Sequence, residues 1–174
     1  SYSLDNLLPA KEKTENSIAF VGSPFNQRVK LINKLKTYGL NIKIFGPPKR
    51  WRKIKTLDKE FFGFLDKNRF FETLNQHKFV YSSMIDMNGN IHMNTKVWES
   101  ICAGSYPIVE RHEAFEAQFG LIDDLRLTYC NDHDDILNLI SDKSTAKKIS
   151  KIQKHINKNF CYDLSYDKLF KFFS

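Results

Sequence analysis

The stretch that decides the fold is residues 93–109, MNTKVWESICAGSYPIV, which predicts a short helix, a glycine stop and a buried strand. Asn94 or Thr95 can cap the start of the helix, and Gly104 can take the left-handed conformation that ends it. The start of a helix presents unpaired N–H groups, and Lys96 adds a full positive charge in the first turn. We therefore expect Asn94, Thr95 and Lys96 to bind a phosphate group.

Residues 96–108 of this stretch resemble the K-x-x-E-x-x-x-x-G-x-x-P-I/V segment in the nucleotide-sugar-binding half of GT-B-fold glycosyltransferases. The similarity is greatest to CgeB-like (spore maturation protein) enzymes, within the glycosyl transferases of group 1 type. The resemblance implies that Glu99 holds the ribose hydroxyls of the nucleotide and that the helix start faces its diphosphate. It also implies a nucleoside-diphosphate sugar as donor, an unknown acceptor, and a second, acceptor-binding domain that supplies the general base.

A parallel βαβ unit is predicted near the start of the chain. Residues 17–21 form an apolar run typical of a buried strand, residues 27–40 have helical apolar spacing, and residues 41–45 form a second strand. The loop after the first strand then lies at the carboxyl end of the sheet, where open α/β folds bind their ligands. Its candidate ligands are Gly22, Ser23 and Arg28.

The predicted fold class is α/β, a Rossmann-like parallel sheet with helices on both faces, as in one half of a GT-B fold. We expect residues 1–16 to be a linker or tail and residues 17–174 to be the nucleotide-sugar-binding domain. A chain of 174 residues has no room for a second large domain. We therefore expect a fragment of a larger enzyme, which binds donor nucleotide but turns over poorly.

A second part of the ligand site is predicted just before a helix at residues 67–75. Phe62, Gly63 and Phe64 match the element that, in the resembled family, lies beside the nucleobase. Glycine lets the backbone approach a flat ring and aromatic side chains can stack on it, although phenylalanines are also ordinary core residues. Many family members have an acidic residue eight positions before the ribose glutamate, where this sequence has Ile91, so the donor-sugar contacts stay open.

The net charge of +7 favours a polyanionic partner, which could be a nucleotide diphosphate, a nucleic acid or an anionic membrane face. Residues 49–55, KRWRKIK, could bind single-stranded nucleic acid by charge and stacking, or rest on an anionic membrane face. The ordinary interpretation of such a run is a solvated loop. The function alternatives are accordingly a non-catalytic basic module that binds nucleic acid or an anionic surface, and a donor domain similar to that of α1,3-fucosyltransferases.

No metal site or cofactor is predicted apart from the donor substrate, and no catalytic residue is identified. The three cysteines and five histidines do not fall at zinc-ligand spacing. Asp132-His133-Asp134 spells the Asp-x-Asp motif that holds Mn²⁺ in GT-A enzymes, but acidic residues at a helix start are explained by the helix dipole. We expect a metal-independent, cytoplasmic protein that could contact the inner face of the membrane.

Overall fold

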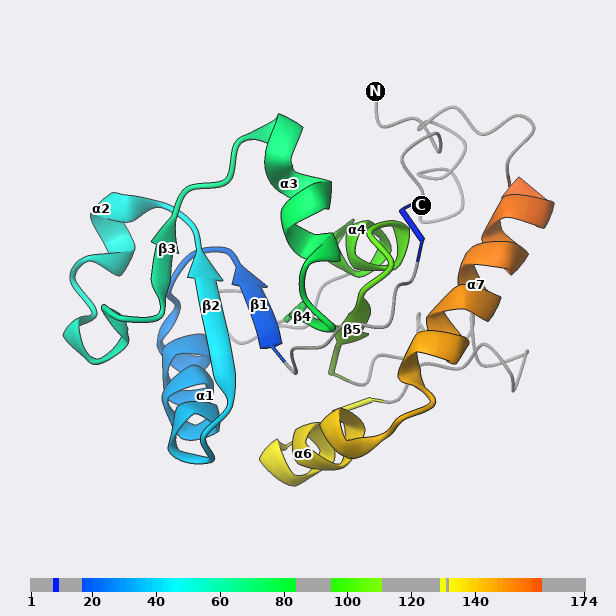
Figure 1. Ribbon diagram of the computed structural model, residues 1–174. Coiled ribbons are helices and arrows are strands. Elements are labelled where there is room, and N and C mark those ends of the chain that lie inside the picture. The colour runs from blue at the N-terminus through cyan, green and yellow to red at the C-terminus, as the bar shows by residue number, and fades with distance from the viewer. Residues whose placement is uncertain (1–7, 10–16, 84–94, 111–128, 131, 161–174) are drawn as a thin grey trace.

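The computed structural model describes residues 8–9, 17–83, 95–110, 129–130 and 132–160, and the elements are labelled as in Figure 1. The strands are β1 (Ser17–Val21), β2 (Asn41–Phe45), β3 (Phe61–Gly63), β4 (Phe79–Tyr81) and β5 (Tyr106–Ile108). The helices are α1 (Asn26–Thr37), α2 (Pro48–Trp51), the 3₁₀ turn η2 (Lys55–Leu57), α3 (Lys67–Asn75), α4 (Thr95–Cys102), α6 (His133–Ser141) and α7 (Thr145–Phe160). None of the helices in these ranges is both long and apolar enough to cross a bilayer.

All the strands are parallel, and their spatial order is β3-β2-β1-β4-β5. The chain therefore builds outward from β1 to β3 in one direction, and then returns to the other side of β1 for β4 and β5. The point where this order reverses lies between β1 and β4. In open α/β sheets the crevice at the carboxyl ends of such a strand pair is where ligands bind.

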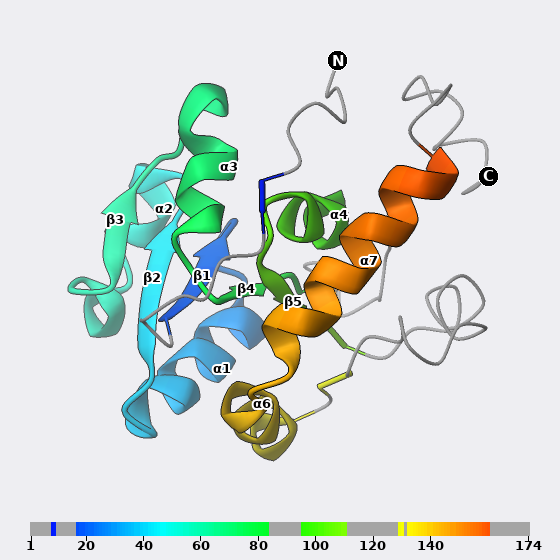
Figure 2. The same ribbon diagram turned by 45° about the vertical axis from the view of Figure 1, so that its right-hand side comes forward.

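Helices cover both faces of the sheet, which confirms the predicted Rossmann-like architecture (Figures 1 and 2). One face carries α1 and α6, the opposite face carries α3 and α4, and α7 lies beyond β5. The central strands are buried because both faces are covered. Ile18, Phe20, Ile44 and Phe79 are all at most 1% exposed, and apolar runs of this kind are typical of strands inside a parallel sheet.

The predicted helix boundaries agree with the structure where a capping residue marks them. Asp66 accepts hydrogen bonds from the backbone N–H groups of Asn68 and Arg69 at the start of α3. Gly104 follows α4 with a φ of 70°, the left-handed conformation that favours glycine. The predicted strands 17–21 and 41–45 are β1 and β2.

The basic segment, residues 49–55, differs from the solvated loop expected from its sequence. Its first part is the helix α2, and Trp51 points into the protein with only 1% of its surface exposed. Trp51 packs edge-on against Phe20, with ring centroids 5.7 Å apart, and its Nε1 donates a hydrogen bond to the Gly22 carbonyl over 2.7 Å. A buried ring cannot stack on a nucleic-acid base, so the predicted stacking at this position is wrong.

Leu8 and Pro9, which lie within the predicted linker, are attached to the domain by backbone and carboxamide hydrogen bonds. The Leu8 N–H donates to the Cys102 carbonyl over 2.9 Å, and the Gln153 amide donates to the carbonyls of Leu8 and Ile101. The Asn75 amide likewise donates to the carbonyls of Pro9 and Ala103. These bonds satisfy carbonyls at the C-terminal end of α4, which have no partner within the helix.

Several sequence predictions lie outside the described residues. They include the binding of phosphate by Asn94, the place of Ile91 relative to the donor sugar, and a helix rich in aromatic residues that we expect at 163–173. The strand expected at 125–129 is described only at Tyr129, which forms a parallel bridge with Val109.

Candidate functional site

A pocket of about 260 Å³ lies at the carboxyl ends of β1 and β4, at the point where the strand order reverses. This volume is below the roughly 300–1,000 Å³ of a typical small-molecule site, so it suits a compact anionic group better than a whole nucleotide sugar. Four of the predicted ligand residues meet here. The pocket is lined by Phe20, Val21, Gly22, Ser23, Phe25, Arg28, Tyr81, Ser83 and Lys96.

Arg28, in the first turn of α1, is held in place by aromatic rings and a backbone carbonyl. Its guanidinium carbon lies 4.6 Å from the centroid of the Phe25 ring and 6.0 Å from that of Phe20. Nη2 donates to the Ser83 carbonyl over 3.5 Å, which joins the β1 loop to the end of β4. Arginine stacks well on aromatic faces and presents a planar fork of donors that matches phosphate oxygens.

Lys96 brings the second positive charge, and its backbone is fixed by two serines. The Lys96 carbonyl accepts hydrogen bonds from Ser82 Oγ, over 3.4 Å, and from Ser100 Oγ. The two serine oxygens are themselves 3.1 Å apart, and both side chains are buried. The hydrogen bond from Ser82 therefore attaches the first turn of α4 to the end of β4, and Lys96 lines the pocket.

Tyr81 and Glu110 form a hydrogen-bonded pair at one side of the pocket. The Tyr81 hydroxyl donates to Glu110 Oε1 over 3.0 Å. Burial is the largest cause that raises the pKa of Tyr81, and the Glu110 charge raises it further. The phenol therefore stays protonated and keeps donating to the carboxylate. Glu110 is thereby held beside Tyr81, which lines the pocket.

Glu99 lies one helical turn beyond Lys96 on α4 and is half-buried. Burial raises the pKa of its carboxyl, and the charge of Lys96 partly offsets that effect. Glu99 does not line the pocket itself. Glu99 therefore lies beside the pocket, one turn from the lysine that lines it.

The other predicted ligand residues that the structure describes do not line the pocket. Phe62 and Phe64 are 57% and 71% exposed at the end of the edge strand β3, and Gly63 between them has a φ of 103°. The Phe62 ring lies 5.5 Å from the ammonium nitrogen of Lys43. Thr95 is exposed at the start of α4. Two strands, β2 and β1, separate the phenylalanines from the switch point.

The backbones of Gly22 and Gly46 pack closely against each other at the rim of the pocket. Gly22 donates its N–H to the Phe45 carbonyl over 2.9 Å, and Gly46 donates to the Gly63 carbonyl over 2.8 Å. A Cβ atom at Gly46 would lie 2.2 Å from the Gly22 oxygen and 2.6 Å from Trp51 Nε1. Only glycine fits at position 46, because any side chain would push apart the pocket loop and α2.

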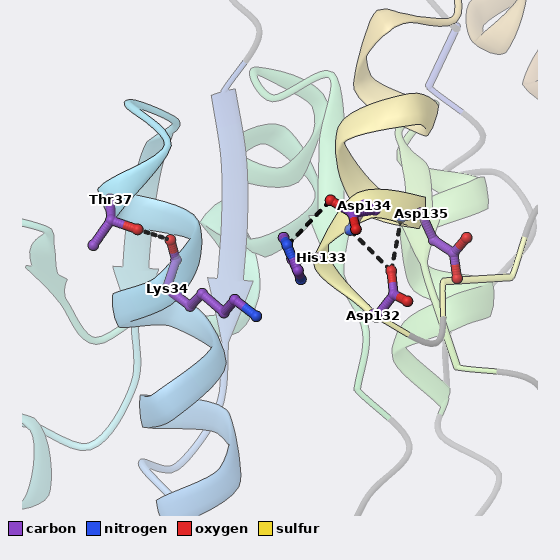
Figure 3. Close-up of polar contacts among 6 residues, drawn as sticks. All are labelled: Lys34, Thr37, Asp132, His133, Asp134 and Asp135. Carbon is purple, nitrogen blue, oxygen red and sulfur yellow. Dashed lines mark hydrogen bonds and ion pairs between the residues drawn. The ribbon is translucent and has the colours of Figure 1, made fainter.

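Asp132, His133 and Asp134 are the only group in the described ranges whose acidic and histidine ligand atoms lie close enough to hold a metal, within 4.8 Å of one another. Figure 3 shows this cluster at the start of α6, beside the last turns of α1. His133 stacks on Tyr38, with ring centroids 5.2 Å apart. The pocket lies at the opposite end of α1, a helix of 12 residues or about 18 Å. The cluster therefore cannot reach a diphosphate bound in the pocket.

The Asp132 carboxylate serves as the N-cap of α6, accepting from the N–H groups of Asp134 and Asp135 at 2.9 and 3.0 Å. The hydrogen bond from Asp135 is the largest cause that lowers the pKa of Asp132. A lowered pKa means that Asp132 stabilises the fold above the usual aspartate pKa, and that this contribution is lost as the pH falls through the lowered value.

Substitution of Asp132 separates capping from metal binding. We expect Asp132→Ala to lower the melting temperature at neutral pH and Asp132→Asn to retain most of the stability, because asparagine also caps helices. Both effects should be the same with and without Mn²⁺. A melting temperature of the unmodified protein that rises with Mn²⁺, and does not rise in Asp132→Ala, would instead assign a metal to this cluster.

Solved structures with the same arrangement of strands and helices are glycosyltransferases. A DNA-modifying β-glucosyltransferase, determined with and without uridine diphosphoglucose, is 20% identical with a TM-score of 0.59, and the match covers 87% of this chain and 48% of that one. TarM is 15% identical with a TM-score of 0.64, covering 97% of this chain and 37% of that one. This chain has the fold of one half of a GT-B glycosyltransferase. No protein-family model and no curated protein matches the sequence.

The chain thus spans less than half the length of these two structures. A variant of the T4 phage β-glucosyltransferase in complex with UDP-glucose is also similar, at 22% identity and a TM-score of 0.55. Matches at this identity establish the GT-B fold of the domain and leave the subtype open.

Sequence reasoning missed several residues around the pocket: Phe20, Phe25, Tyr81 and Ser83. Tyr81 ends β4 and Ser83 follows it two residues later. Their place beside β1 depends on the strand order, which no local pattern encodes. The signal that could have found them is the topological rule that β4 returns to the free side of β1.

Proposed function

We propose that this domain binds the nucleoside-diphosphate sugar donor of a glycosyltransferase. The proposal rests on one observation: two cationic side chains, Arg28 of α1 and Lys96 in the first turn of α4, line the same pocket at the switch point of a GT-B-type sheet. In this proposal the diphosphate occupies the pocket, with the N-terminus of α4 and both side chains compensating its charge. Glu99 then binds the ribose hydroxyls one turn farther along.

The reaction joins the sugar to an acceptor hydroxyl. A bond forms between the hydroxyl oxygen and the anomeric carbon, and the bond from that carbon to the distal phosphate oxygen breaks, leaving its electron pair on the diphosphate. The hydroxyl proton passes to a base, which we assign to an acceptor-binding domain. Arg28 and Lys96 would stabilise the charge that develops on the departing diphosphate.

The similar structures support this donor class because they were determined with uridine diphosphoglucose, UDP-glucose or UDP. One of them contains UDP together with Mn²⁺. We propose that this chain needs no metal at the pocket, since two fixed cations already face it, and the proposal is tested by adding Mn²⁺ or a chelator to the binding measurements. Residues 96–108 favour a CgeB-like enzyme, and a donor domain similar to that of α1,3-fucosyltransferases is the alternative.

The experiment that tests the proposal is thermal unfolding with a panel of UDP, GDP, ADP, CMP and their sugars. A ligand that binds only the folded state raises the melting temperature. We expect one nucleotide diphosphate to do so, and the shift to be lost in Glu99→Ala. No shift with any of these ligands would overturn the proposal, and the base and sugar that give the largest shift would decide between the two subtypes.

Glu99→Gln should separate the role of Glu99 in binding from its effect on stability. Because burial raises the pKa of Glu99, ionising this carboxyl costs folding free energy. That cost is absent at low pH and grows as the pH rises through the raised pKa. We therefore expect ligand-free Glu99→Gln to melt above the unmodified protein at neutral pH, with a difference that shrinks toward about pH 4, while its nucleotide-dependent shift falls.

The matched control is the same change at Glu72, an exposed glutamate on α3. Glu72→Gln should alter neither the pH dependence of the melting temperature nor the shift produced by nucleotide. An unchanged nucleotide shift in Glu99→Gln would contradict the ribose-binding role.

A further inference from the structure

The basic segment, residues 49–55, presents five cationic side chains to solvent. Lys49, Arg50, Arg52, Lys53 and Lys55 are all exposed. Lys36 pairs with Glu60 and His133 with Asp134, and no ion pair among the described residues involves this segment. Such a density of uncompensated positive charge attracts polyanions.

The segment is attached directly to the loop that lines the pocket. Trp51 Nε1 donates to the Gly22 carbonyl over 2.7 Å, and Arg50 Nη1 donates to Ser23 Oγ over 3.4 Å. Gly22 and Ser23 both line the pocket. The positive charge of α2 therefore begins at the rim of the pocket and extends away from it, and the buried Trp51 ring fixes its position.

The segment offers charge without an exposed apolar side chain. Trp51 and Leu57 are 1% and 0% exposed, and Ile54 packs against the core. Insertion into lipid needs exposed apolar side chains, and base stacking needs exposed aromatic rings. The basic segment itself presents neither. It presents several charges that lead away from the pocket rim, which suits contact with successive phosphates along a chain.

We propose that the basic segment is an acceptor-side surface that binds a polymer with a repeating phosphodiester backbone. This inference rests on the proposed function, because a sugar can be transferred only to an acceptor that reaches the mouth of the donor pocket. Arg50 would contact the phosphate nearest the pocket, and Arg52, Lys53 and Lys55 those farther along. The polymer is held through its backbone, so binding should depend little on base sequence.

The test compares two variants that lose the same charge at different places. The first is Arg52→Gln/Lys53→Gln/Lys55→Gln, which spares Arg50 because Arg50 contacts the pocket loop. The control removes three exposed lysines of α7, as Lys147→Gln/Lys151→Gln/Lys154→Gln. The probe is a labelled single-stranded DNA oligonucleotide, with binding followed by fluorescence anisotropy over a range of salt concentrations.

We expect the basic-segment variant to bind the oligonucleotide roughly 10-fold or more weakly, and the slope of log affinity against log salt to fall by about 2. The control should lose clearly less affinity, and the melting-temperature shift with nucleotide should be unchanged in both. Equal losses in the two variants would overturn the inference, since they would reflect net charge alone.

Three further outcomes would also overturn it. Binding to vesicles of phosphatidylserine and phosphatidylcholine, without binding to the oligonucleotide, would assign the segment to a membrane instead. Oligonucleotide binding through the segment in a protein that binds no nucleotide diphosphate would refute the proposed function, and the acceptor role with it. If nucleotide raises the melting temperature as proposed but the oligonucleotide does not bind, only this inference is refuted.

Discussion

Arg28→Ala is expected to weaken the binding of the preferred nucleoside diphosphate roughly 10- to 100-fold, equivalent to about 1.5–3 kcal/mol for a charge-assisted hydrogen bond. The effect is large because the side chain is already positioned: the guanidinium stacks on Phe25 and donates to the Ser83 carbonyl before any ligand binds. Lys96→Ala should act in the same direction, since Lys96 faces the same pocket. Isothermal titration calorimetry with the nucleotide identified by thermal unfolding measures both effects.

The control for this prediction is Lys30→Ala, which removes an exposed positive charge two residues away on α1. It should leave the affinity nearly unchanged. Arg28→Lys keeps the charge but loses the stacked, planar fork, so an intermediate affinity is expected. If Arg28→Ala and Lys30→Ala weaken binding equally, Arg28 contributes only to the overall positive electrostatic potential of the protein and does not contact phosphate.

Trp51→Ala is expected to lower the free energy of unfolding by about 3–5 kcal/mol, the usual cost of removing a large buried aromatic side chain. Trp51 is 1% exposed, packs on Phe20 and binds the Gly22 carbonyl. Its removal also releases α2 from the pocket loop, so nucleotide affinity should fall as well. Urea unfolding followed by circular dichroism gives the stability change.

Trp51→Phe tests the hydrogen bond separately from the packing. Phenylalanine retains most of the buried ring but cannot donate to the Gly22 carbonyl, so a smaller loss of about 1–2 kcal/mol is expected. A Trp51→Ala variant within about 0.5 kcal/mol of the unmodified protein, as is usual for surface substitutions, would contradict the structural role of this side chain.

The parts of the fold that the sequence predicted are those set by local chemistry. Asp66 before a helical pattern and Gly104 after one are capping signals that act within a few residues. The apolar runs of β1 and β2 have the length and composition of buried parallel strands. In each case the neighbours that decide the structure are also neighbours in the sequence.

The parts that escaped prediction depend on contacts between distant segments. Trp51 stands among basic residues and has the local sequence of a solvated loop, but Gly22, 29 residues earlier, supplies its partner. The edge strand β3 has only three residues, too few to show a period, so Phe62 was predicted only as part of a ligand-binding element. Of the predicted ligand residues, Gly22, Ser23, Arg28 and Lys96 line the pocket, whereas Tyr81 of β4 and Ser83 after it were not predicted.

The two tryptophans are placed so that their fluorescence should report ligand binding at the pocket. The Trp51 indole donates to the Gly22 carbonyl on one wall of the pocket, and Trp98 lies on α4 between Lys96 and Glu99, partly packed against the core. A ligand that draws the first loop and this helix together would change the surroundings of both rings. Intrinsic emission should therefore follow occupancy in real time without any label, and the Trp51→Phe variant would isolate the signal from the α4 side.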